Sequence, residues 1–291
     1  MLWNILLITF LSFTTTFISG LINIGLLTSI FITKKLKKSE EMTLFYARFA
    51  IDAAFGINNG SVLLIAFLYF FGALELDSKN ILFFMLWLGV NFSQCRGFLA
   101  LVITIDRTLA VYTPIQYHNN RKRIPNFLIF LLLFGFVLIN NWVLWGYCSY
   151  QFKIPEGCVS FACATNKCYM DFWLAHEQVI YILISIFSIL LILKFYIWNH
   201  CYKKAKKSLD LSRANRLAVI DTFVIFTFDL IPTIITAWIF PLTSERTGPI
   251  MPLTKATGFV VDGVLVVMAL KRKNAIGKKI SVIGASSRSI K

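Results

Sequence analysis

The sequence predicts an all-α membrane protein built as a bundle of seven transmembrane helices. Three observations predict this fold class: the composition, the length of the apolar segments and the distribution of the basic residues. Of 291 residues, 57% are hydrophobic, only 15% are charged and 28 are Phe. This balance is too apolar for a soluble domain of ordinary composition.

Seven segments are mostly apolar over about the 20 residues that a helix needs to cross a bilayer. Each is predicted to be helical, because backbone polar groups in lipid must be satisfied within the segment. They form one transmembrane domain, 1–270, followed by a basic tail, 271–291. The first is expected to stay in place as a signal-anchor, because its apolar core is longer than that of a signal peptide. The expected spans are about 5–33, 43–71, 80–112, 126–147, 173–198, 216–240 and 253–270.

The basic residues predict the orientation, because Lys and Arg concentrate in cytoplasmic loops. On one side of the predicted membrane they cluster at 34–38, 121–123, 203–216 and 271–291. The N-terminus is therefore expected outside and the C-terminus in the cytoplasm. The net charge of +15 then faces anionic lipid headgroups, and its dispersion over short loops argues against a nucleic-acid partner. The opposite side carries only scattered basic residues: Lys79, Lys153, Lys167, Arg246 and Lys255.

Polar residues within the spans predict an internal polar core. Asn23 lies in the first span, where an amide can form hydrogen bonds across helices. In the second span, Arg48 and Asp52 are one turn apart, so they either neutralise each other or Asp52 faces other helices. Arg96 in the third span stays charged when buried and needs acceptors. Its candidate partners near mid-span are Asp52, Asp229 and Asp262.

The third span ends in an adjacent acid and base, Asp106 and Arg107, and Pro114 then breaks the helix. Such a pair either marks the water interface or has a function. The stretch resembles the end of the third helix of rhodopsin-like receptors, in which Asp-Arg-aromatic precedes Ala-Val-x-x-Pro-x-x-Tyr. Tyr117 matches the final position, whereas Thr108 replaces the aromatic residue.

The loop from 148 to 171 contains four of the six cysteines and faces the expected outer side. Clustered cysteines in an oxidising compartment predict disulfide bonds, and a zinc site is the less favoured alternative. Three pairings are possible, and all three stay open. Residues 80–91 contain no cysteine, unlike the third helix of rhodopsin-like receptors, so the loop is expected to be tied within itself. The cysteines are Cys148, Cys158, Cys163 and Cys168.

The last three helices carry further polar residues. The fifth is expected to begin near His176 and Glu177. In the sixth, Asp221 lies about 7 Å inside the inner boundary, a depth that Arg107 can reach. Pro232 removes a backbone hydrogen bond and is the expected hinge. The seventh has Asp262-Gly263 where rhodopsin-like receptors have Asn/Asp-Pro-x-x-Tyr.

Two stretches carry a closer resemblance. They are Asp-Arg-Thr-Leu-Ala-Val-Tyr-Thr-Pro-Ile-Gln-Tyr-His at 106–118 and Ala-Asn-Arg-Leu-Ala-Val-Ile-Asp-Thr-Phe-Val-Ile-Phe-Thr-Phe-Asp at 214–229. Both resemble the nematode serpentine chemoreceptors of class BC (Srbc), and the resemblance extends along most of the chain. It implies a G-protein-coupled sensory receptor in the plasma membrane, in particular the ciliary membrane of chemosensory neurons. The implied partners are a small-molecule cue, a heterotrimeric G protein and the lipid bilayer, with no cofactor, metal or enzymatic activity.

For such a receptor we expect a ligand in the outer half of the bundle and G-protein coupling at the inner end. The residues expected to line the ligand pocket are Gly89, Phe92, Ser93, Thr233 and Thr236. The residues expected to act in coupling and activation are Asp106, Arg107, Pro114, Tyr117, Asp221 and Pro232.

Two other classes of function compete with the receptor. Intramembrane charges also mark ion paths, so a ligand-gated channel or transporter is the main alternative, although no inverted repeat is evident. Aspartates in the sixth and seventh spans suggest an intramembrane hydrolase. The Gly-x-Gly-Asp motif of such enzymes is missing, however, and Arg96 would disable a dyad. A lysine in the seventh span, Lys255, also raises the interpretation of a retinal protein, but at the outer end of the span its side chain can simply snorkel.

Overall fold

The structure is a computed structural model of the whole chain. The residues it describes are 2–35, 38, 42–72, 79–121, 124–152, 154–155, 158, 161–201, 213–235 and 253–270. Within these residues, seven helical spans are long and apolar enough to cross a membrane. The predicted seven-helix fold is therefore confirmed. Thr236 and the tail 271–291 lie outside the described residues.

Several of the seven spans are composite, because a π-helical turn continues the α-helix. The first span is α1 (Leu2–Leu27) with η1 (Thr28–Ile32), and the fourth is α5 (Asn126–Trp142) with η3 (Val143–Tyr147). The second, third and fifth are α2 (Thr43–Phe70), α3 (Lys79–Tyr112) and α7 (Lys167–Cys201). The sixth joins α8 (Arg213–Val224), η4 (Ile225–Leu230) and α9 (Ile231–Ile234), and the seventh is the helix Leu253–Leu270. Two short helices, α4 (Pro114–Arg121) and α6 (Phe161–Ala164), lie in connections.

The fifth span begins earlier than its apolar run suggests. α7 starts at Lys167, whereas the sequence predicted a span of about 173–198 with the helix beginning near His176 and Glu177. The side-chain oxygen of Asn166 accepts a hydrogen bond from the Tyr169 amide at 3.1 Å, which caps the first turn. The cap lets the helix begin at Lys167 and Cys168, before the apolar run starts.

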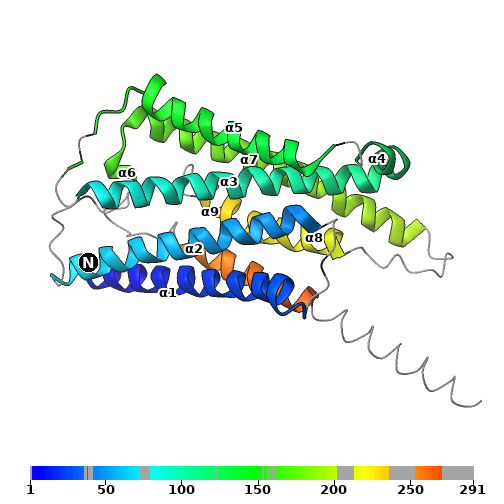
Figure 1. Ribbon diagram of the computed structural model, residues 1–291, viewed down its shortest axis with the longest axis horizontal. Helices are drawn as coiled ribbons and strands as arrows, with labels where there is room; N and C mark the ends of the chain where they lie inside the picture. Colours follow the sequence, from blue (N-terminus) through cyan, green and yellow to red (C-terminus); the bar gives the residue numbers. More distant parts are fainter. Residues whose placement is uncertain are drawn as a thin grey trace, which may run out of the picture.

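α3 is the central helix of the bundle. It contacts α2, α5, α7 and α8, and α1 packs along α2 on the far side (Figure 1). α5 turns many large apolar side chains outward, including Leu132, Phe134 and Ile139, each at least 60% exposed. Such a surface suits contact with lipid rather than water.

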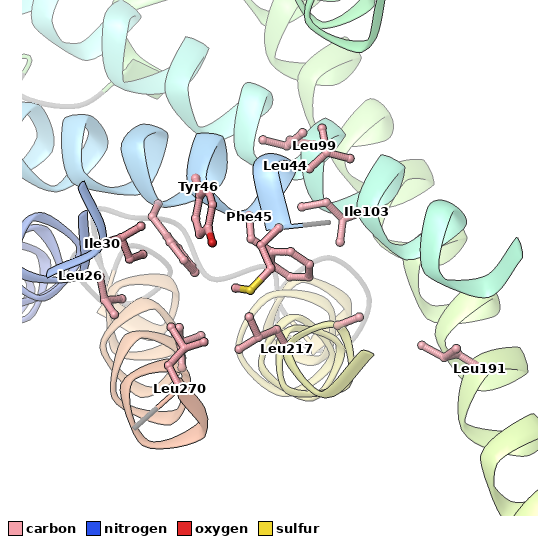
Figure 2. Packing of buried hydrophobic residues seen from close by; sticks show 14 residues of the cluster. Leu26, Ile30, Leu44, Phe45, Tyr46, Leu99, Ile103, Leu191, Leu217 and Leu270 are labelled. Carbon is pink, nitrogen blue, oxygen red and sulfur yellow. The ribbon is translucent and has the colours of Figure 1, made fainter. Parts of the chain in front are cut away.

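A buried apolar layer crosses the bundle near one end, which we call the inner end because it holds Asp106 and Arg107. The opposite end, which holds Cys148 and Cys168, is the outer end. The layer draws on α2, α3, α8 and the 253–270 helix, and Figure 2 shows these side chains packed together. On α3 the layer lies between Arg96 and Asp106, so it separates two groups of charged residues along the helix. Its central members include Leu44, Phe45, Leu99, Ile103, Leu217, Val266 and Leu270.

Gly56 permits the close approach of α1 and α2. A Cβ atom added at Gly56 would lie 2.6 Å from the Gly20 Cα and 3.1 Å from the Thr16 carbonyl oxygen. Both obstacles are backbone atoms of α1, so only a shift of the whole helix relieves the contact. Small residues at membrane helix interfaces commonly have this role.

We expect Gly56→Ala to lower the stability of the purified protein by about 1–3 kcal/mol, the usual cost of overpacking a tight interior. Gly25→Ala is the matched control, because nothing lies within 4 Å of an added Cβ there. The measurement is the thermal unfolding midpoint of each variant in lipid nanodiscs. Equal midpoints for the two variants would contradict the close packing of α1 on α2.

Candidate functional site

Six buried charged residues from five helical segments form a group that we call the charged cluster, and on α3 this group lies on the outer side of the apolar layer. α2 contributes an arginine and an aspartate, and α3 contributes the second arginine. The other aspartates come from α8, η4 and the 253–270 helix. Each residue is at most 3% exposed. The members are Arg48, Asp52, Arg96, Asp221, Asp229 and Asp262.

Arg48 links three helices within the charged cluster. Its guanidinium forms an ion pair with Asp221, and its Nη2 lies 2.6 Å from Asp262 Oδ2. The pair with Asp52 on its own helix is longer, at 3.7 Å from Nε to Oδ2. Local neutralisation within α2, which the sequence left open, is therefore the weakest of the three contacts. Arg48 instead connects α2 to α8 and to the 253–270 helix.

Arg96 occupies the side of the cluster nearer the outer end. Its Nε lies 2.9 Å from Asp52 Oδ1, and its Nη1 lies 3.8 Å from Asp229 Oδ2. Its guanidinium carbon is 3.9 Å from the centroid of the Phe259 ring, a cation–π contact in a buried setting. Of the three candidate partners, Asp52 and Asp229 pair with Arg96, and Asp262 pairs with Arg48.

The charged cluster contains four carboxyl groups and two guanidinium groups, so acids outnumber bases. Both oxygens of Asp229 and Asp262 Oδ1 lack hydrogen-bond donors in the part of the chain that the structure describes. Buried charges in a membrane are costly unless they are paired, and each guanidinium here contacts at least two carboxylates. Across the described ranges, no three histidine, cysteine or acidic side chains are placed to hold a metal ion.

Asp106 organises a second group of polar residues at the inner end, the inner charged site. Its carboxylate pairs with Arg107, accepts hydrogen bonds from the Tyr117 hydroxyl at 2.9 Å, and lies 2.9 Å from Arg121 Nε. Arg121 also donates to the Asn126 side chain at 2.6 Å. Burial raises the pKa of the Tyr117 hydroxyl, so it remains a donor at neutral pH. The site therefore ties α4 and the start of α5 to the end of α3.

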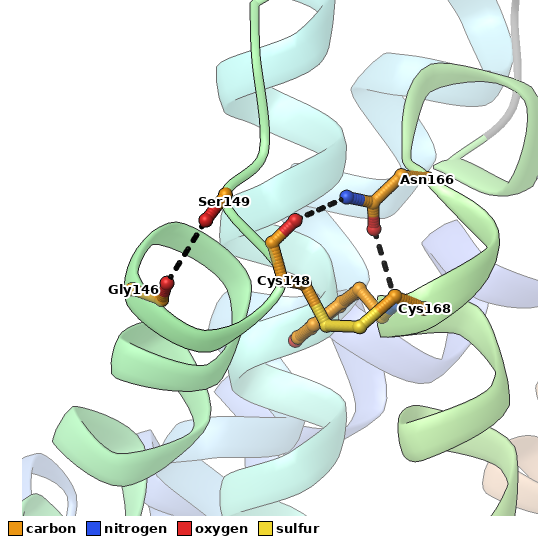
Figure 3. The surroundings of a disulfide bond; sticks show 6 residues. Gly146, Cys148, Ser149, Asn166 and Cys168 are labelled. Carbon is orange, nitrogen blue, oxygen red and sulfur yellow. Dashed lines mark hydrogen bonds between the residues drawn. A yellow bond between two sulfur atoms is a disulfide. The ribbon is translucent and has the colours of Figure 1, made fainter.

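The outer end is closed by a disulfide-bonded connection. Cys148, just after η3, is bonded to Cys168 in the first turn of α7, and Cys158 is bonded to Cys163. Figure 3 shows the Asn166 side chain beside the first bond, where it donates to the Cys148 carbonyl at 2.7 Å. The predicted disulfides are thus confirmed, and the structure selects one of the three pairings. Closing a 20-residue loop in this way contributes about 3 kcal/mol.

Below this connection, a small cavity lies between α3 and α7. Its lining includes Ser93, Gln94, Glu177 and Tyr181, and its volume of about 10 Å³ has room for one water molecule. An ion pair joins Glu177 to the 253–270 helix, with 2.8 Å between Lys255 Nζ and Glu177 Oε2. The outer half therefore holds polar groups of α3 and α7 around a small space, and Glu177 links this space to Lys255 on the 253–270 helix.

The seven membrane-length helices agree with the family that the chain matches. The model of the family described as serpentine type 7TM GPCR chemoreceptor Srbc matches residues 1–274. The chain belongs to this family. No curated protein matches it.

Within this Srbc receptor, the structure corrects the expected surroundings of Asp221. The sequence placed Asp221 within reach of Arg107, in the coupling set. In the structure Asp221 pairs with Arg48, and Arg107 pairs with its neighbour Asp106. The apolar layer explains the difference, because Leu217 lies one turn closer to the inner end and separates the two groups.

The residues expected to line the ligand pocket lie in different surroundings. Ser93 lines the cavity, whereas Gly89 faces α2, because an added Cβ would lie 3.1 Å from Asn58 Nδ2. Thr233 is buried in α9 and donates to the Asp229 carbonyl at 2.6 Å, and Phe92 is half-buried on α3. The observed cavity therefore faces α7 rather than the sixth span.

The remaining expected residues are placed as follows. Asn23 is buried in α1 and donates to the Ser19 carbonyl of its own helix at 3.0 Å. Pro114 begins α4, and Pro232 lies in α9, directly after the π-helical turn η4. The irregular backbone thus coincides with the expected hinge.

Sequence reasoning did not single out the Glu177–Lys255 pair, Gln94 or Arg121 as site residues. Lys255 and Glu177 are 78 residues apart, and each lies near the outer end of its span. One acid and one base near the same depth are the signal in the sequence that could have identified this pair. Gln94 offered a weaker signal, as a polar residue two positions before Arg96.

Proposed function

We propose that this Srbc chain is a G-protein-coupled chemosensory receptor that binds a small molecule in the outer half and signals through Arg107. The family supports the sensory receptor as a class. The inner charged site supports the coupling step, because it holds Arg107 on Asp106 where the third span ends. The proposal extends to the ciliary membrane of chemosensory neurons, which the resemblance implies.

Two features support a transition between two states. In the inner charged site, Arg107, Tyr117 and Arg121 all contact the carboxylate of Asp106, so loss of this carboxylate contact weakens all three interactions together. The sixth span has a π-helical turn followed by Pro232, and both features weaken the regular hydrogen bonding of a helix. A pivot at this position would move α8 relative to α3.

Ligand binding can drive such a pivot only through its different affinity for the two states. The observed cavity holds about one water molecule, so a larger ligand must enlarge it. Because α7 contacts both α8 and η4, an enlargement of the cavity that displaces α7 also shifts the sixth span. This coupling connects the outer cavity to the proposed hinge.

Signalling in cells that express the wild type or Arg107→Ala tests the proposal. A panel of small-molecule odorants is applied, and ligand binding, G-protein dissociation, membrane current and surface expression are measured. We expect the ligand response to be lost in Arg107→Ala while ligand binding is retained. Leu132→Ala is the matched control, because Leu132 is 64% exposed on α5 and lies outside both charged groups.

A current that persists without G protein and survives Arg107→Ala would overturn the proposal in favour of a ligand-gated channel. A G-protein response of unchanged size in Arg107→Ala would remove Arg107 from the mechanism. Equal surface expression of all variants is the condition for either conclusion.

A further inference from the structure

The lining of the cavity between α3 and α7 includes two buried side chains with acceptor oxygens, Gln94 and Glu177. Gln94 is 2% exposed, and its Oε1 lacks a hydrogen-bond partner within the described ranges. The Glu177 carboxylate lines the same cavity and is also buried. A buried acceptor without a donor is costly, so Gln94 Oε1 favours a ligand that brings an N–H group.

A positively charged nitrogen already occupies the edge of this region. Lys255 Nζ lies 2.8 Å from Glu177 Oε2, 5.7 Å from the centroid of the Trp173 ring and 5.6 Å from that of Tyr181. A carboxylate combined with aromatic rings is the chemistry that recognises ammonium groups. An anionic ligand would instead meet Glu177 and Gln94 Oε1, which both repel it.

We infer that the outer half of this receptor recognises the ammonium group of a small amine, which replaces the Lys255 ammonium against Glu177. The five residues Gln94, Trp173, Glu177, Tyr181 and Lys255 form this outer ammonium site. The inference rests on the proposed function, because it names the ligand class of the same receptor. Displacement of Lys255 breaks the ion pair between α7 and the 253–270 helix, and this gives the ligand a direct effect on helix packing.

The lysine side chain itself suggests the probe. Lys255→Ala removes three methylene groups and the ammonium, which together correspond to n-propylamine, protonated at neutral pH. The receptor variant is purified in lipid nanodiscs, and its thermal unfolding midpoint is followed with increasing n-propylamine. We expect a concentration-dependent rise, because a ligand that binds only the folded state stabilises it.

Three comparisons isolate the ammonium contact. n-Propanol, of the same chain length without the charge, should leave the midpoint unchanged. Adding Glu177→Gln to Lys255→Ala should weaken the n-propylamine effect about tenfold or more, because a charge-assisted hydrogen bond is lost. Lys194→Ala is the matched control variant, since Lys194 also lies over a tyrosine ring, 5.2 Å from that of Tyr112, but near the inner end.

In the wild type, n-propylamine must compete with Lys255. A higher concentration than for Lys255→Ala is therefore needed for the same rise in the thermal unfolding midpoint. Equal effects of n-propylamine and n-propanol on Lys255→Ala would overturn the inference. Stabilisation of the wild type by propionate, lost in Lys255→Ala, would also overturn it and make Lys255 the ligand contact. The stability assay contains no G protein, so a failure of coupling through Arg107 leaves its result unchanged. Conversely, a negative result with n-propylamine leaves the proposed coupling through Arg107 unchanged.

Discussion

Arg48→Met is expected to unfold most of the receptor or retain it inside the cell. The substitution leaves Asp221 and Asp262 buried without their guanidinium partner, and Asp52 keeps only Arg96. Removing one partner of a buried ion pair costs about 3–5 kcal/mol, because the remaining charge is uncompensated. This is a large fraction of the total stability of a typical protein. Surface expression and the thermal unfolding midpoint in nanodiscs measure the loss.

A compensating variant separates lost charge balance from lost packing. Adding Asp221→Asn and Asp262→Asn to Arg48→Met removes the two acids that Arg48 contacts most closely, so most of the surface expression should return. Leu132→Ala, on the lipid-facing side of α5, provides the baseline for an unrelated substitution. If Arg48→Met alone expressed and melted like this baseline, the charged cluster would not hold the helices together.

Asp106→Asn is expected to raise signalling in the absence of ligand, given the proposed function. The substitution removes the negative charge shared by Arg107, Tyr117 and Arg121, so all three lose their strongest partner. A change of about 1–3 kcal/mol between two states corresponds to a shift of about 5- to 150-fold in their ratio. Basal G-protein dissociation, normalised to the number of receptors at the surface, measures the effect.

Tyr117→Phe is the graded comparison for this second prediction. It removes one hydroxyl donor and leaves the Asp106–Arg107 ion pair intact, so its basal signalling should lie between those of the wild type and Asp106→Asn. If Asp106→Asn gave the same basal signalling as the wild type at equal surface expression, Asp106 would not restrain Arg107.

Local features of the sequence predicted much of this receptor. The seven spans follow from apolar length alone, because a membrane-crossing helix must satisfy its own backbone. A local motif placed Asp106 and Tyr117 in one expected set, and the structure joins these residues, eleven positions apart across the break at Pro114, by a hydrogen bond. The start of α7 was missed because a capping side chain, rather than apolarity, sets it.

The partners within the charged cluster depend on how the helices are rotated and at what depth they meet. Neither property is encoded in the hydropathy of a single segment. The sequence therefore predicted three candidate acids for Arg96, and in the packed structure Arg96 pairs with Asp52 and Asp229. Arg48 had an acid one turn away, yet its closest contacts come from the sixth and seventh spans.

By itself, the sequence determined the class of the protein, the number of its spans, its family resemblance and the presence of charges in its interior. The tertiary structure alone decided the disulfide pairing, the Glu177–Lys255 bridge, and the separation of the charged cluster from the inner site by an apolar layer. The physical reason is the range of the interactions. Burial and helix formation are properties of short segments, whereas an ion pair between distant helices exists only once packing has placed both side chains at the same depth.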